Sequence, residues 1–237
     1  MTKPKILRLI LGDQLNINHA WFHQVDDSVT YVLMEIRSET DYTQHHIQKV
    51  IGFFAAMRRF CDVLRSEKHH VIYIKLNDPT NLQQFDKNCA ALIQAHQFTQ
   101  FEYLLPDEYR VQTHLDAFTD QLEIPYKVSD TEHFYSTRTE LATLFEGKKM
   151  YLMETFYRYM RKKHRVLMQG DDKPLHDQWN FDEDNRQKLP KNHQPIPPLL
   201  FSNNVVEIAS EIEKANIKTI GTVDATQFIW PIDRAQS

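Results

Sequence analysis

Short apolar runs alternate with amphipathic segments along residues 1–135, and this alternation constrains the fold more than any other feature of the chain. The apolar runs lie at about 6–11, 29–36, 71–76, 101–105 and 126–128. Residues 44–65, 82–96 and 111–122 carry apolar side chains at three- and four-residue spacing, which predicts helices. Such alternation is typical of parallel α/β proteins. We therefore expect a doubly wound, mainly five-stranded, Rossmann-like parallel sheet flanked by helices.

After about residue 135 the alternation stops, and we expect residues 136–237 to form a helical and loop extension. Helical spacing recurs at 138–145, 151–168 and 204–214. The loop at 169–201 is too long for a simple connector, and its aromatic residues favour packing on another body. We predict an α/β domain at 1–135 and, at 136–237, an extension that links to a further domain. Because residues 230–237 resemble the first turn of a helix, we expect a longer parent protein.

Composition limits the classes of function. The formal net charge of −4 argues against a surface devoted to nucleic acid, so any DNA contact requires a local basic patch. Cys61 and Cys89 lack Cys-x-x-Cys spacing and fall at apolar positions of predicted helices, which indicates buried thiols. With no long apolar run and no signal peptide, we expect a cytoplasmic protein without membrane contact. The 12 histidines show no ligand pattern, so we predict no metal site.

The first apolar run ends at Gly12-Asp13-Gln14, where a parallel sheet would present polar groups at its edge. Gly12 permits a tight turn, and Asp13 and Gln14 can exchange hydrogen bonds with a heterocycle. We expect a helix to follow and to supply free N–H groups; the alternative is that Asp13 only caps that helix. With five glycines and no Gly-x-Gly-x-x-Gly, the chain has no phosphate-cradling loop of the dinucleotide type.

Further candidate residues should reach the same sheet edge. Glu35 ends the second run, and Glu39 and Tyr42 follow it, so that carboxylates could hold ring N–H groups or ribityl hydroxyls. The alternative for Glu39 is a solvated loop charge. Phe53, on the less apolar side of the following helix, could form the wall of a ring pocket or belong to the core. Residues 108–110 follow the fourth run and could reach this crevice.

The concentrated basic patch lies in the predicted helix at 151–168. Its candidate DNA contacts are Arg158, Arg161 and Lys162. The alternative is a solvated helix face. Arg186 could grip a phosphate or stack on a base, or it could pair with Asp182 or Glu183. Because the sequence shows no nucleophilic or hydrolytic constellation, we predict no self-contained catalytic site.

Several motifs, in order, resemble the amino-terminal half of proteins of the cryptochrome/photolyase superfamily. They are Leu9-Ile10-Leu11-Gly12-Asp13-Gln14-Leu15, then His45-His46-x-x-Lys49 leading into Ala56-Met57-Arg58, then Glu154-x-x-Tyr157-Arg158-x-Met160-Arg161, and finally Trp179-Asn180-Phe181-Asp182-x-x-Asn185-Arg186. Within the superfamily, the chain is most similar to photolyase-related proteins of the bacterial iron-sulfur (6-4) photolyase branch. Such proteins often carry glycines before their Trp-Asn, where this chain has residues 175–178.

The resemblance implies an antenna domain that absorbs near-ultraviolet or blue light and passes excitation to a flavin in light-dependent DNA repair. Its chromophore would be 6,7-dimethyl-8-ribityllumazine or a pterin. The pocket would map onto Gly12, Asp13, Gln14, Glu35, Glu39, Tyr42 and Phe53. FAD and a [4Fe-4S] cluster would belong to a carboxyl-terminal helical half that this chain lacks, so the chain alone is expected to be inactive. Arg158, Arg161, Lys162 and Arg186 would contact damaged DNA or that second domain.

Two other classes of function are compatible with the residues. The chain could be a free-standing α/β domain that binds a nucleotide or a flavin-like ligand without light chemistry. Alternatively, the basic segment at 157–165 and the aromatic loop could bind a protein partner. The resemblance also leaves open whether the parent is a photolyase or a signalling cryptochrome.

Overall fold

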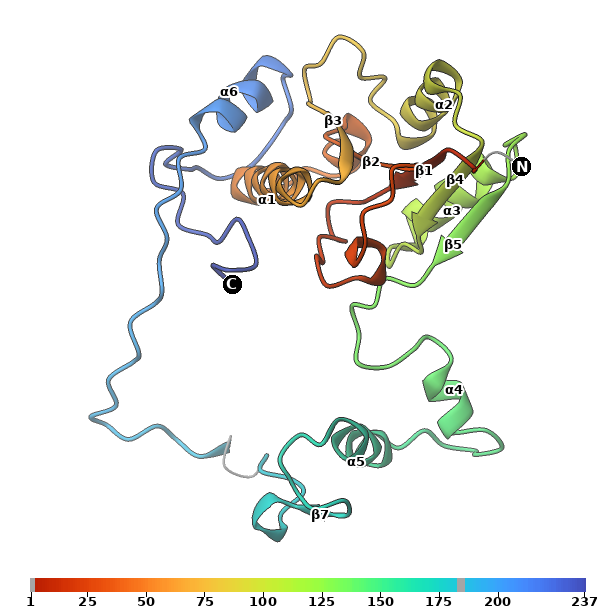
Figure 1. The fold of residues 1–237 in the computed structure, drawn as a ribbon. Coiled ribbons are helices and arrows are strands. Elements are labelled where there is room, and N and C mark those ends of the chain that lie inside the picture. The colour runs from red at the N-terminus through yellow and green to blue at the C-terminus, as the bar shows by residue number, and fades with distance from the viewer. Residues whose placement is uncertain (1–2, 183–185) are drawn as a thin grey trace. The chain divides into compact units, whose positions relative to one another are not determined.

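A five-stranded parallel sheet forms the centre of the computed structural model, which describes residues 3–182 and 186–237. The strand order is β3-β2-β1-β4-β5 (Figure 1). The strands are β1 (Ile6–Leu9), β2 (Val29–Met34), β3 (His70–Ile74), β4 (Gln100–Leu104) and β5 (Tyr126–Ser129). All are paired in parallel with their neighbours. The predicted α/β fold is confirmed.

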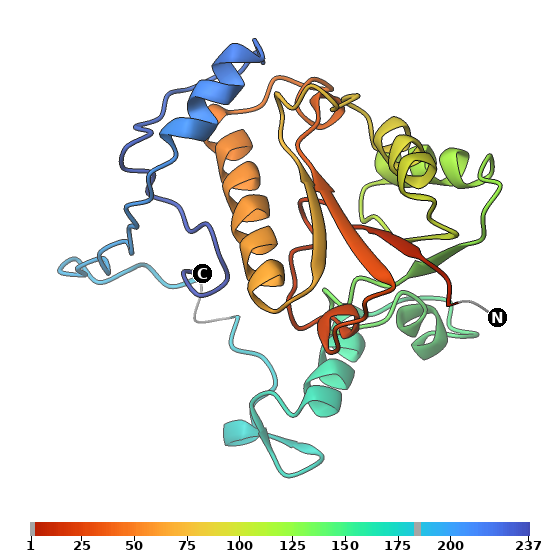
Figure 2. The same ribbon diagram turned by 45° about the horizontal axis from the view of Figure 1, so that its top comes forward.

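Helices cover both faces of this sheet, as Figure 2 shows. On one face lies α1 (Ile47–Ser66), and on the other lie α2 (Phe85–His96) and α3 (Tyr109–Thr119). Alternate residues of a strand point to opposite faces, and β1 follows this rule. Ile6 belongs to the core beneath α1, whereas Leu7 and Leu9 belong to the core beneath α2 and α3. Both faces of the central strand are therefore buried, which explains its continuous apolar run.

The direction of winding reverses between β1 and β4. The chain leaves β1 for β2 and β3 on one side, then crosses through α2 to β4 and β5 on the other side. In open α/β sheets, ligands bind in the crevice outside the carboxyl ends of the strands at such a reversal. The fold therefore places a crevice beside the residues that follow β1, β2 and β4.

The connection from β1 to β2 differs from the prediction, because no helix follows Gly12 directly. Turns occupy this segment, and its short 3-10 helix η1 (Ala20–Phe22) begins seven residues after Asp13. Side chains satisfy the backbone here: Asn16 Oδ1 accepts a hydrogen bond from the Asn18 amide at 3.2 Å, and His19 Nδ1 accepts one from the Trp21 amide at 3.1 Å. Such local bonds compete with helix formation. The expected helix, and with it the capping role of Asp13, was wrong.

The last segment of the chain packs against α1. Helix α6 (Val206–Lys214) buries Ile208 and Ile212 in the core beneath α1, and Phe228 joins them. By their contacts, Met1–Thr131 and Leu199–Ser237 form one compact unit, and Glu132–Pro198 form another. The sequence grouped 199–237 with the extension, whereas in the structure the apolar stripe of α6 attaches this segment to the α/β unit.

The second unit, Glu132–Pro198, contains α4 (Glu140–Leu144), α5 (Met153–His164) and a short hairpin of β6 (Met168–Gln169) and β7 (Lys173–Pro174). A 3-10 segment, η3 (Leu175–Asp177), follows. His176 and Asp177 have φ angles of 59° and 55°, in the left-handed region that glycine adopts most easily. They lie within residues 175–178, the segment before Trp-Asn for which the resemblance implies frequent glycines.

Two further observations concern the sequence predictions. Cys61 and Cys89 are buried free thiols, as predicted, and burial raises the pKa of both. Of the helices formed by the described residues, none has the length and apolar character needed to cross a membrane.

Candidate functional site

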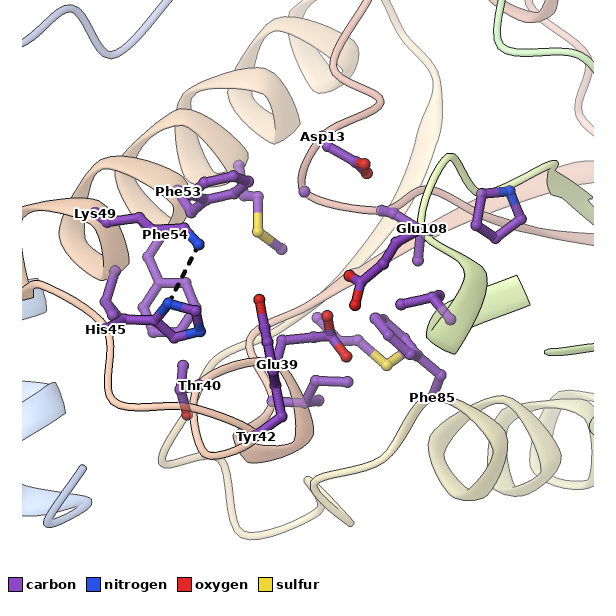
Figure 3. A pocket seen from close by; sticks show the side chains of 18 residues that line it. Asp13, Glu39, Thr40, Tyr42, His45, Lys49, Phe53, Phe54, Phe85 and Glu108 are labelled. Atoms are coloured by element: carbon purple, nitrogen blue, oxygen red, sulfur yellow. Dashed lines mark hydrogen bonds between the residues drawn. The ribbon is translucent and has the colours of Figure 1, made fainter. Parts of the chain in front are cut away.

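A cavity of about 190 Å³ lies at the carboxyl ends of β1, β2 and β4, within the α/β unit (Figure 3). Its walls come from the segments after these strands, from α1, and from the first turns of α2 and α3. The lining residues are Leu11, Gly12, Asp13, Met34, Ile36, Glu39, Thr40, Tyr42, His45, Lys49, Val50, Phe53, Phe54, Met57, Phe85, Pro106, Glu108 and Val111. Apolar walls with a few convergent polar groups are typical of small-molecule sites.

Most of the sequence-predicted pocket residues line this cavity. They are Gly12, Asp13, Glu39, Tyr42 and Phe53. A Cβ on Gly12 would lie 3.0 Å from Met57 Sδ and 3.2 Å from Phe53 Cδ1. A side chain at this position would therefore press against Met57 and Phe53 and displace these cavity walls by a few tenths of an ångström.

Gln14 and Glu35 lie outside the cavity lining. The Gln14 side chain is buried; its Oε1 accepts a hydrogen bond from the Leu11 amide at 3.1 Å, and its Nε2 donates to the Leu104 carbonyl at 3.2 Å. This amide ties the end of β1 to the end of β4. Gln14 thus stabilises the backbone next to the crevice and does not line it.

Glu35 is 0% exposed and is surrounded by donors. Arg58 donates two hydrogen bonds to its carboxylate, at 2.6 and 2.9 Å. The Tyr73 hydroxyl and the Leu76 amide donate at 2.7 and 3.0 Å. This carboxylate therefore anchors β2, β3 and α1 to one another, with its hydrogen-bonding capacity filled from within the fold.

An arginine joins the loops on either side of the cavity. Arg110 donates to Glu39 at 3.1 and 2.9 Å and to Glu108 at 2.8 and 3.1 Å. Its guanidinium also lies 4.2 Å from the centre of the Tyr42 ring. Burial and the Glu108 carboxylate raise the pKa of Tyr42, which keeps the phenol neutral. The loops after β2 and β4 are thus held together, and one wall of the cavity is fixed.

His45 and Lys49 are polar lining residues that the sequence did not assign to the site. The Lys49 ammonium lies 3.2 Å from His45 Nδ1, the contact drawn in Figure 3. Burial and the Lys49 charge lower the pKa of His45, so the imidazole is neutral near pH 7. Their four-residue spacing at the start of α1, within a motif that carries the resemblance, was the available signal.

A second hollow of about 550 Å³ adjoins the cavity across Gly12, Asp13, Lys49 and Phe53. Its remaining lining is His46, Gln48, Gly52, Ala56, Phe228, Trp230 and Pro231. Trp230 Nε1 donates to Gln48 Oε1 at 2.8 Å, which holds the last segment of the chain against α1. Nothing in the local sequence could indicate this wall, because Trp230 is about 180 residues from α1.

The predicted DNA-contact residue Arg161 is only 4% exposed. Its guanidinium donates to the carbonyls of Val166, Leu167 and Trp179, and it lies 5.2 Å from the centre of the Trp179 ring. Arg161 therefore organises the interior of the second unit.

The other predicted DNA contacts are more exposed and are paired with acids. Arg158 donates to Glu154 at 2.7 Å, Lys162 to Asp172 at 2.8 Å, and Arg186 to Asp182 at 3.2 Å. Arg158 and Lys162 also lie 5.2 and 5.9 Å from the centre of the Trp179 ring. The alternative partner of Arg186, Glu183, lies outside the described residues, as do Asp184 and Asn185.

Comparison with known proteins identifies the family. Residues 8–228 match the family model described as deoxyribodipyrimidine photo-lyase-related protein. The chain belongs to this family. The match covers nearly all of this photolyase-related chain, including strands β2 to β5, the cavity lining and the second unit.

Individual relatives agree with this assignment. A (6-4) photolyase of Agrobacterium fabrum (strain C58) is 34% identical over 215 residues, which make up 90% of the photolyase-related chain and 41% of that enzyme. An uncharacterized protein of Acanthamoeba polyphaga mimivirus is 24% identical over 155 residues, which make up 63% of this chain and 75% of the viral protein. The photolyase-related chain thus spans less than half of the length of the curated photolyase that it matches.

Proposed function

We propose that this chain is the amino-terminal antenna part of a photolyase-related flavoprotein that acts in light-dependent DNA repair, most directly of (6-4) photoproducts. The supporting observation is the cavity at the reversal of the sheet, which is lined by Gly12, Asp13, Glu39, Tyr42 and Phe53. The resemblance to photolyases implies an antenna chromophore at these positions, which supports the proposal. The (6-4) photolyase among the relatives supports the choice of lesion.

The cavity suits a flat heterocycle with a polar side chain. Phe53 and Tyr42 supply aromatic surfaces, and the backbone at Gly12 leaves room for a ring to approach. Asp13, Glu39 and Glu108 supply oxygens that accept hydrogen bonds from ring N–H groups or hydroxyls. The adjoining hollow beside Trp230 gives a ribityl chain a path outward. These features fit 6,7-dimethyl-8-ribityllumazine, or a pterin.

The flavin chemistry belongs, in this proposal, to the part of the longer relatives that the chain does not match. A [4Fe-4S] cluster requires four thiolates, whereas Cys61 and Cys89 are buried in separate helices. Among the described residues, no group of His, Cys, Asp or Glu is arranged to hold a metal ion. FAD supplies the electron for lesion repair when it is bound, and the present chain contributes the light absorber.

In this proposal, DNA is bound by Arg158, Lys162 and Arg186, which lie at the surface. Each would exchange its acidic partner for a DNA phosphate while the second unit stays folded. Their ion pairs are exposed and therefore weak, which makes this exchange inexpensive. The same residues could instead meet the helical half of the parent protein. Arg161 supports this surface from within the second unit.

A free-standing nucleotide- or flavin-binding domain is the second candidate. The strand order β3-β2-β1-β4-β5 and a cavity at its reversal favour it, because mononucleotide sites use the same geometry. The residues after β1 count against it, since they form no Gly-rich phosphate loop.

A titration separates these candidates. The purified chain is titrated with 6,7-dimethyl-8-ribityllumazine and followed by fluorescence polarisation, with riboflavin and ATP as comparison ligands. Saturable binding of the lumazine alone is expected. The D13A/E39A double variant should lose this binding while keeping its circular dichroism spectrum. The control variant D27A removes an exposed carboxylate that does not line the cavity, and it should bind the lumazine normally. Binding of ATP in place of the lumazine would favour the second candidate.

A further inference from the structure

His45 carries a buried nitrogen that no acceptor of the described residues meets with hydrogen-bond geometry, although the Glu39 backbone favours a proton on this ring. The residue is 8% exposed and lines the cavity. Its Nε2 atom is one of two buried side-chain polar atoms without a hydrogen-bond partner among the described residues; the other, Thr131 Oγ1, is not part of the lining. The ring is held edge-on to Tyr42, with ring centres 4.8 Å apart. In Figure 3 it stands at one side of the cavity, with Glu108 at the opposite side.

Lys49 determines which nitrogen of this imidazole carries the proton. An ammonium group has three donors and no acceptor, so the 3.2 Å contact between Lys49 Nζ and His45 Nδ1 requires Nδ1 to accept. In a neutral imidazole the other nitrogen then bears the hydrogen. His45 Nε2–H is therefore a donor, and its orientation is fixed by Lys49 from behind and by Tyr42 at the side.

A buried donor without an acceptor is unfavourable, and an occupant of the cavity can remove this cost. We infer that His45 is a specificity-determining residue that donates a hydrogen bond to the ligand's carbonyl oxygen or unprotonated ring nitrogen. The inference rests on the proposed function, because it assumes that the cavity takes a heterocycle.

The other polar groups narrow the class of ligand. Asp13, Glu39 and Glu108 offer carboxylate oxygens, which accept only. The Thr40 hydroxyl is already engaged, since it lies 3.3 Å from the Arg37 carbonyl and 3.0 Å from Asp41 Oδ1. The cavity therefore presents donors at His45, Lys49 and the Tyr42 hydroxyl, and acceptors at the three carboxylates. Its complement is a ring with an acceptor at one edge and N–H or hydroxyl groups at others, as in pyrimidinedione and pterin rings.

Two amide substitutions of His45 test this donor with nearly the same side-chain chemistry. In H45N, the amide can still face Lys49, but nothing reaches the position of Nε2. In H45Q, the longer side chain carries its NH₂ group to about that position. With the lumazine as the probe, we expect about tenfold weaker binding for H45N and a loss of less than about threefold for H45Q, because one neutral hydrogen bond is at stake.

The tautomer provides a readout that does not depend on the ligand. Long-range ¹H–¹⁵N spectra of the wild-type chain near pH 7 should show His45 neutral and protonated at Nε2, and K49M should shift the population toward protonation at Nδ1. A wild-type spectrum with the proton on Nδ1 would overturn the inference whatever the binding data show. Thermal melts of each variant establish that the fold is intact.

The outcomes distinguish this inference from the proposed function. If the wild type binds the lumazine and the two variants are equally affected, or equally unaffected, His45 contributes shape alone and the donor role is refuted while the antenna proposal stands. If the wild type shows no saturable binding, the antenna proposal fails and the donor role fails with it. Selective weakening in H45N supports both.

Discussion

Replacing Arg58 with methionine should destabilise the α/β unit more than any nearby surface change. Arg58 neutralises the Glu35 carboxylate through two hydrogen bonds, and it also pairs with Glu211 and Glu207 on α6. Burial disfavours its charge, yet these carboxylates more than offset the effect and raise the pKa of Arg58. Methionine fills a similar volume but leaves a fully buried carboxylate without its cation.

The magnitude follows from the burial of Glu35. Removing one partner of a buried ion pair typically costs about 3–5 kcal/mol, because the remaining charge is neither solvated nor compensated. The hydrogen bonds from the Tyr73 hydroxyl and the Leu76 amide remain, so we expect about 3 kcal/mol. With a urea dependence of about 2 kcal/mol per molar, this corresponds to a fall of about 1.5 M in the unfolding midpoint.

The assay is urea unfolding at pH 7, followed by circular dichroism. Arg59 provides a matched control, since it is the next residue of the same helix and pairs with Asp233 at 3.2 Å while about half exposed. R59M should cost less than about 1 kcal/mol, as exposed ion pairs do. E35Q introduced into R58M should recover part of the loss, because a neutral amide no longer needs the cation. Equal effects of R58M and R59M would refute the reasoning.

Three other changes have defined outcomes. G12A should weaken lumazine binding at least tenfold in the polarisation titration, because its Cβ would lie 3.0 Å from Met57 Sδ and 3.2 Å from Phe53 Cδ1 in the cavity wall. The same crowding should lower the free energy of unfolding by only about 1–3 kcal/mol. The hydrogen bond from Lys163 lowers the pKa of Glu140 from 4.5 to about 2. The ionised carboxylate therefore stabilises the fold above pH 4.5, and this stabilisation is lost as the pH falls toward 2. Urea unfolding midpoints of the wild type should fall over this range, whereas those of E140Q should lack this change. R161L should open the second unit to limited proteolysis, since three carbonyls lose the buried guanidinium that joins them. R165L, which removes an exposed pair, should not have this effect.

The fold was predictable because its signals are local. Continuous apolar runs predicted the ends of the strands to within two residues, and three- and four-residue spacing predicted the helices. The segment after Gly12 was not predictable in this way. Its conformation depends on side-chain hydrogen bonds made by Asn16 and His19. The same residue types can make similar bonds at the start of a helix, so the sequence does not distinguish the two conformations.

The site was predictable only as a location. A parallel sheet brings Gly12, Glu39 and Phe53 to one edge regardless of the exact loop conformations, and they line one cavity. Whether a polar residue at that edge faces the cavity depends on neighbours distant in sequence. Glu35 turns to Arg58 and Tyr73 instead, and no pattern in the second run could reveal this.

The basic run in α5 illustrates a further limit. Counting cations predicted a surface patch, yet the fold places Arg161 inside, against Trp179 and three carbonyl oxygens. Its exposed neighbours Arg158 and Lys162 have acid partners. The sequence identifies charges, whereas their net effect on a polyanion depends on which acids the fold brings beside them.

The packing of α6 and Phe228 on α1 sets an order of events during synthesis. The strands and their connecting helices are complete by residue 131, but the apolar side chains that cover α1 arrive only with residues 199–237. At about 5–20 residues per second, roughly 100 residues and 5–20 s separate the two. During that interval a nascent chain lacks the side chains that cover this face of α1, and the wall beside Trp230 is the last part of the hollow to be built.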